Sequence, residues 1–100
     1  MFARIRDDQI GRVRGWLTEL PERRRQAEET YEREGTRAER AYLLDTSNGA
    51  VLVYIMEVED LERAYAAFDS STLPIDLELK ALMSEAVEAP LDPELLYAYP

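Results

Sequence analysis

The residues best suited to acid–base chemistry in this chain are Asp76, Glu57 and Tyr54. Asp76 follows Pro74 and Ile75 at the start of an expected helix, and Tyr54 and Glu57 lie in one apolar strand. A carboxylate could abstract a proton while a tyrosine hydroxyl stabilises the developing negative charge. For Asp76 we favour a structural role, because the backbone dipole stabilises an acid in the first turn of a helix.

A second set, Arg4, Tyr42 and Tyr54, could bind a ligand. These side chains are expected on one face of a sheet, where Arg4 could hold a carboxylate through two parallel hydrogen bonds. We favour simpler roles for all three. Tyrosine rings pack readily where subunits meet, and Arg4 could pair with Glu57 or with an acid of a second subunit.

Much other chemistry is missing, because the 100 residues include no histidine and no cysteine. Histidine is the commonest general base and metal ligand, and cysteine supplies disulfides, thiolate nucleophiles and sulfur ligands. Tight zinc, copper or haem sites are therefore not expected, and we predict no metal and no cofactor.

The charge is unevenly distributed along the chain. Residues 1–40 carry 10 Arg and 9 acids, whereas residues 41–100 carry one Arg and one Lys against 12 acids, for a net charge of −9. A net-acidic domain disfavours nucleic acid, whose binding depends on phosphate neutralisation. We expect no nucleic-acid partner.

Hydrophobic spacing predicts the elements that position these residues. Strands are expected at 2–6, 39–45, 50–57 and 94–99, and helices at about 8–34, 61–68 and 74–88. Gly35 should end the first helical segment. Pro21 interrupts that segment, and two interpretations remain open: a kinked continuous helix, which we favour, or a helix that ends near Glu19 and a new one that starts at Pro21.

This order predicts one α+β domain over residues 1–100 with the ferredoxin-like βαββαβ arrangement. Right-handed crossovers place the helices on one face of a four-stranded antiparallel sheet with spatial order 4-1-3-2.

The third strand is apolar on both faces, and it follows a turn that we assign to Ser47, Asn48 and Gly49. We assign to the helix-covered face Ala3, Ile5, Ala41, Leu43, Val51, Val53 and Ile55. The other face would form an apolar surface larger than monomers usually expose. A second copy of the chain should cover it, giving a homodimer whose interface includes Leu44, Leu52, Tyr54, Met56 and Tyr97. The alternative is that the C-terminal segment folds across this face.

Several segments resemble a family of small uncharacterised bacterial proteins with a domain of unknown function. They are Trp16-Leu17-Thr18-Glu19-Leu20, Arg23 to Gly35, Leu52-Val53-Tyr54-Ile55-Met56-Glu57, Asp60-Leu61 and Pro74-Ile75-Asp76. The resemblance implies a ferredoxin-like fold that looks like the dimeric α+β barrel group, which includes cofactor-free monooxygenases, isomerases and haem-degrading enzymes. The resemblance implies one histidine just before the Pro-Ile-Asp segment and another just after it. This chain departs from that pattern, with Leu73 at the first position and Leu79 or Lys80 at the second.

Two functional hypotheses follow from these patterns. The first is a homodimeric protein that binds a small apolar or aromatic molecule. The second is a cofactor-independent enzyme of the isomerase or monooxygenase type. The longest apolar run, 50–56, is far shorter than the roughly 20 residues of a membrane helix, and the first residues lack a signal-peptide core. A cytoplasmic protein without a membrane partner is expected.

Overall fold

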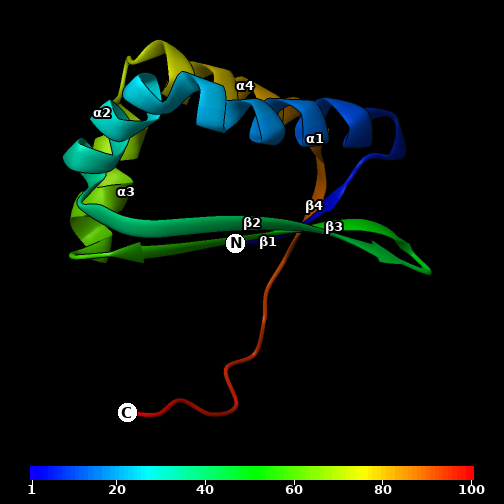
Figure 1. The fold of residues 1–100 in the computed structure, drawn as a ribbon. Coiled ribbons are helices and arrows are strands. Elements are labelled where there is room, and N and C mark those ends of the chain that lie inside the picture. The colour runs from blue at the N-terminus through cyan, green and yellow to red at the C-terminus, as the bar shows by residue number, and fades with distance from the viewer.

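A computed structural model describes residues 1–100 as one sheet with helices packed on one of its faces (Figure 1). Short 3-10 turns η1 and η2 span Asp7–Gln9 and Leu20–Arg23. The strands are β1 (Phe2–Ile5), β2 (Thr36–Thr46), β3 (Gly49–Val58) and β4 (Val87–Leu91), and the helices are α1 (Ile10–Glu19), α2 (Arg24–Glu34), α3 (Leu61–Ser70) and α4 (Pro74–Ala86).

The sheet is antiparallel throughout, with the spatial order β2-β3-β1-β4. This is the predicted order, and the α+β class and the four-stranded antiparallel sheet are confirmed. The two central strands, β1 and β3, are the most hydrophobic, while β2 and β4 form the edges. Pro90 is tolerated in β4 because one side of an edge strand has no ladder partner.

The faces of β3 are the reverse of those predicted. The hairpin has a two-residue loop, Ser47-Asn48, and Gly49 already pairs with Thr46. A shift of one residue turns every side chain of a strand to the other face. Leu52 therefore pairs with Leu43 on the helix side and is 0% exposed, so its prediction as an interface residue is wrong.

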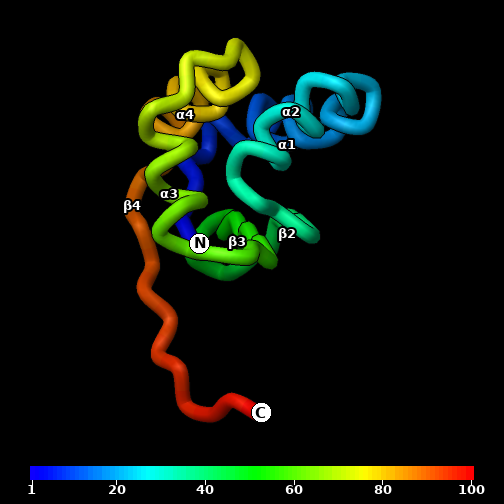
Figure 2. Tube along the Cα trace, turned by 90° about the vertical axis from the view of Figure 1, so that its left-hand side faces the viewer, coloured from blue at the N-terminus to red at the C-terminus, as the bar shows by residue number.

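The last predicted strand, 94–99, is also wrong. α4 ends at Ala86 and the chain enters β4 at once, since Val87 already has extended dihedrals. Residues 92–100 have no regular structure. They leave the domain on the side of the sheet opposite the helices (Figures 1 and 2). The segment therefore does not fold across its own sheet.

Pro21 separates two helices. α1 ends at Glu19 and Pro21 lies in the first turn of η2, which matches the second of the two sequence-based interpretations. Gly35 ends α2 as predicted, with a left-handed φ of 71° and its N–H donating to the carbonyls of Tyr31 and Glu32.

The core lies between the helices and the sheet. It centres on six buried residues, namely Ala3, Ile5, Val13, Leu52, Leu82 and Ala86. Only 16 of 100 residues are buried, so the described chain has a small core for its length. None of its helices is both long and apolar enough to cross a membrane.

Candidate functional site

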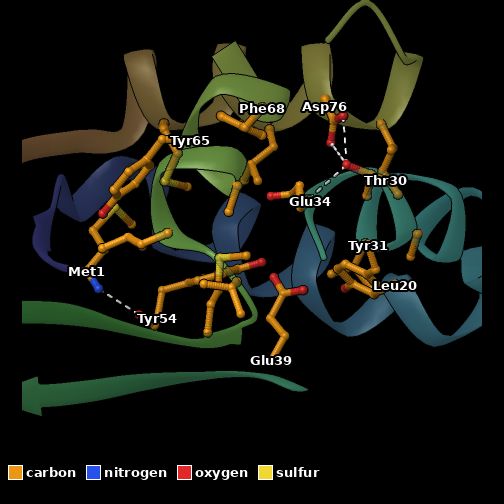
Figure 3. A pocket seen from close by; sticks show the side chains of 18 of the residues that line it. Met1, Leu20, Thr30, Tyr31, Glu34, Glu39, Tyr54, Tyr65, Phe68 and Asp76 are labelled. Atoms are coloured by element: carbon orange, nitrogen blue, oxygen red, sulfur yellow. Dashed lines mark hydrogen bonds between the residues drawn. The ribbon is translucent and has the colours of Figure 1, made fainter. Parts of the chain in front are cut away.

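A cavity of about 310 Å³ lies between the helices and the end of the sheet formed by β2 and β3 (Figure 3). Fifteen of its 19 lining residues are hydrophobic, and they come from α1, α2, α3, α4 and both strands. The polar exceptions are Thr30, Glu34, Glu39 and Asp76. Binding sites for small molecules have this character, with apolar walls and a few placed polar groups.

The four buried polar residues of the chain form a single hydrogen-bonded network at one end of this cavity. They are Thr30, Glu34, Ser71 and Asp76. The Ser71 hydroxyl donates to Asp76 Oδ2 at 2.5 Å, and the Thr30 hydroxyl lies 2.8 Å from both Asp76 oxygens. The network joins α2 to the junction between α3 and α4, and it satisfies a carboxylate that is only 3% exposed.

Glu34 shares the Thr30 hydroxyl with Asp76. The Thr30 hydroxyl lies 3.0 Å from Glu34 Oε1, and its one hydrogen is divided between the two carboxyl groups. Burial raises the pKa of Glu34, the hydrogen bond from Thr30 lowers it, and the nearby charge of Asp76 raises it further.

Glu39 is the carboxyl group that has no such support. It projects from β2 into the cavity beside Tyr31 (Figure 3), and its Oε2 atom is buried without a hydrogen-bond partner. Burial raises the pKa of Glu39 to about 7; the charges of Glu34 and Asp76 add to this rise, and Tyr31 partly offsets it. Burial also raises the pKa of Tyr31 above its ordinary value, so this phenol stays protonated at neutral pH.

Simple periodicity places these acids in the cavity. Thr30 and Glu34 are one helical turn apart on the α2 face that also carries the buried Ala27. Glu39 alternates with Ala41 and Leu43 along β2, the residues expected on the helix side. Neither Glu34 nor Glu39 was among the predicted site residues, although an acid on the buried face of a helix or a strand was a usable signal.

The predicted acid–base residues separate into two groups. Asp76 and Tyr54 both line the cavity. Glu57 is exposed on β3 and does not line it. Asp76 lies in the first turn of α4, and its oxygens accept hydrogen bonds from the Thr30 and Ser71 hydroxyls.

The predicted ligand set is also divided between the two faces. Tyr42 pairs with Val53 and Arg4 with Val51 on the open face, whereas Tyr54 pairs with Ala41 on the helix side. Tyr42 and Tyr54 are therefore not neighbours on one face, as had been predicted. The two-residue loop of the hairpin again explains the difference.

The predicted interface residues are also divided between the two faces of the sheet. Leu44 lies on the open face and is 50% exposed, and Tyr97 lies in the projecting segment and is 79% exposed. Tyr54 and Met56 lie on the same helix-side face of β3 as Leu52, and both line the cavity. Val51, Val53 and Ile55 replace them on the open face.

The acids of the cavity do not form a metal centre, since no group of three or more His, Cys, Asp or Glu residues is placed to hold an ion. What they offer is one network that is internally satisfied and one carboxyl, Glu39, that is free to accept a hydrogen bond or a proton. A second, more open hollow of about 560 Å³ shares Tyr31, Glu39 and Tyr54 with the cavity. Glu39 thus lines both hollows.

A family model with the description "Family of unknown function (DUF6176)" matches residues 2–100. The chain belongs to this family. The match spans every element from β1 to the projecting segment, so the cavity and the open face of the sheet both lie within the family domain. No curated protein and no solved structure matched the chain.

Proposed function

We propose that the cavity binds a small, largely apolar or aromatic molecule that presents one hydrogen-bond donor to Glu39. The observation that carries this proposal is a 310 Å³ space with mostly hydrophobic walls and one carboxyl oxygen without a partner. An apolar cavity of about 150 Å³ admits benzene, so this one has room for a substituted ring. A bound donor would satisfy the orphan oxygen, which otherwise costs roughly 1–3 kcal/mol.

The proposal can be tested with three compounds that share a ring and a two-carbon chain: ethylbenzene, 2-phenylethanol and 2-phenylethylamine. Trp16 is the single tryptophan and lines the cavity, so its fluorescence reports binding. The ammonium compound should bind best above pH 7, where Glu39 is ionised. Its affinity should fall about tenfold at pH 5 and in E39Q, while the affinity for ethylbenzene should change little.

A pair of variants on α3 provides the control. Ala64 is buried and lines the cavity, so Ala64→Leu fills part of the space. Ala66 lies two residues further on and is exposed, so Ala66→Leu adds the same atoms outside the cavity. Binding that is lost in Ala64→Leu and kept in Ala66→Leu supports the site. Equal affinity in both variants, or no fluorescence response to any of the three compounds, contradicts it.

The second candidate is cofactor-independent proton transfer, which the pKa of about 7 at Glu39 favours. Glu39 replaces the bases suggested by the sequence, because Asp76 is occupied by two hydroxyl donors and Glu57 is outside the cavity. Arg4 lies on the other face, so Tyr31 or Tyr54 would stabilise an enolate. Deuterium incorporation into 1-phenylpropan-2-one in D₂O should exceed the buffer rate, and E39Q should abolish the excess. A rate equal to that of buffer contradicts catalysis.

We also infer that two copies of the chain associate through the open face, in the manner of a dimeric α+β barrel. Tyr42, Leu44 and Ile55 are each about half exposed there, and Val51 and Val53, each 9% exposed, lie between them on the same face. Sedimentation equilibrium at micromolar concentration measures this directly. A single 11.5 kDa species across the range contradicts the dimer.

A further inference from the structure

The segment 92–100 is the most exposed apolar part of the molecule. Leu95, Leu96, Tyr97 and Tyr99 are 79–86% exposed, although each is of a type that proteins bury. The chain runs out from β4 without touching the helix layer, on the side of the open sheet face (Figure 2). Exposed apolar groups of this size mark a surface that another molecule covers.

The accessible surface area of the chain is also larger than that of a compact monomer. The accessible surface is 7268 Å², whereas a compact monomer of this mass should expose about 5,800 Å². The excess of about 1,500 Å² exceeds the roughly 800 Å² that one partner buries in a standard interface. The open face and the projecting segment therefore supply enough surface for a stable association of two copies.

We propose that residues 92–100 form an arm that crosses the open sheet face of a second copy of this chain. This inference rests on the dimer proposed above and adds its means of assembly. In an extended segment Leu95, Tyr97 and Tyr99 share one side, which would lie on the row of Tyr42, Val53 and Phe2 across the partner's sheet. The exchange is symmetric, with each copy giving one arm and receiving another.

Length and an unsatisfied donor both fit this occupant. Nine extended residues reach about 30 Å, and four strands are about 15 Å across. The open face carries Arg4 and Arg40, neither of which has an ion pair in the chain, and Arg4 Nε is buried without a partner. Backbone carbonyls of an arm that crosses this face would accept a hydrogen bond from that guanidinium.

The first experiment measures the dimer dissociation constant by sedimentation. We expect the full chain to dimerise at micromolar concentration, and the chain truncated after Leu91 to show a dissociation constant at least tenfold higher. The variant L95S/Y97S/Y99S keeps the length of the arm and should behave like the truncation. Ala98→Ser is the matched control and should leave the constant unchanged.

The second experiment locates the arm. The chain has no cysteine, so Ala98→Cys accepts a single nitroxide label without altering the three apolar anchors. Labelled protein without isotope is mixed with ¹⁵N protein that carries no label, so that broadening reports contacts between copies only. We expect broadening at the amides of the open face, centred on Val51, Val53 and Ile55. A label at the exposed Glu28→Cys on α2 should not produce it.

The outcomes separate the two proposals. A dimer whose dissociation constant ignores the truncation, or whose open-face amides are not broadened by the arm of the other copy, overturns the arm and leaves the dimer. Broadening only when label and isotope share one chain shows that the arm covers its own sheet, and overturns the exchange. A monomer at every concentration overturns both the dimer and the arm.

Discussion

Glu39 differs from the other cavity acids because one of its oxygens, Oε2, is buried without a donor and Tyr31 only partly offsets the burial. Asp76 has the Thr30 and Ser71 hydroxyls, and it is the more buried of the two residues. Burial without donors disfavours the charged form. A carboxyl group that titrates near neutrality inside an apolar cavity is therefore the chemically distinctive residue of this chain.

Replacing Glu39 with Gln should change how stability depends on pH. The pKa of Glu39 is raised to about 7 in the folded protein, so its contribution to stability is fully present below about pH 4.5 and is lost as the pH rises through 7. E39Q should match the wild type near pH 4 and exceed it by roughly 1–3 kcal/mol at pH 8. Urea unfolding at both pH values measures this, with the exposed Glu57→Gln as control. A constant difference at both pH values contradicts the assignment.

Thr30 should contribute to stability through its hydroxyl. Thr30→Val keeps the shape of the side chain but leaves Asp76 with one donor, so we expect a loss of roughly 1–3 kcal/mol in the free energy of unfolding. Thr18→Val on α1 removes an exposed hydroxyl that bonds only to backbone carbonyls, and it should change stability by less than about 0.5 kcal/mol. Similar losses in the two variants would show that the buried Thr30 hydroxyl contributes no more to stability than an exposed one.

At the scale of elements, the position of Gly35 decides where Glu34 and Glu39 lie relative to each other. Gly35 ends α2 in a left-handed conformation and turns the chain directly into β2, which brings the end of the helix and the start of the strand to the same side of the cavity. A Cβ at this position would lie 3.3 Å from Arg63 Nη1, the end of a flexible side chain. Backbone strain is thus the main cost of a substitution.

Gly35→Ala should therefore destabilise the protein by roughly 1–2 kcal/mol. Gly11 and Gly15 in α1 have open space around their Cβ positions, and Ala there should stabilise slightly because it favours a helix. Thermal unfolding of Gly35→Ala and Gly15→Ala compares the two directly. A shift of the same sign in both would contradict the role of the left-handed conformation.

At the scale of the whole molecule, a small core and a large surface make association part of stability. Anything that binds the folded form alone raises the unfolding temperature with concentration. The midpoint should therefore rise over a hundredfold increase in protein concentration. Ile55→Lys places a charge on the half-exposed open face and should remove that dependence. A midpoint independent of concentration in the unmodified chain would contradict a stabilising dimer.

The sequence by itself determined the elements and their order. Periodicity identified the first three strands, the helix after Asp60 and the helix after Pro74, and Gly35 marked the end of α2. These signals are local, and the right-handed crossover then leaves one sheet order, which the structure shows. The position of the fourth strand was missed because α4 passes into β4 with no loop, while the alternating Leu95, Tyr97 and Tyr99 imitate a strand.

Only the tertiary structure decided which face of β3 is inside. Both faces are apolar, so the pattern of β3 holds no preference, and one residue of loop length set the choice. The cavity likewise required three separate elements to meet: α2 brings Glu34, β2 brings Glu39 and α4 brings Asp76. Each acid alone resembles any surface acid, and its burial arises only from the neighbours that packing supplies. The raised pKa values of Glu34 and Glu39 follow from that burial.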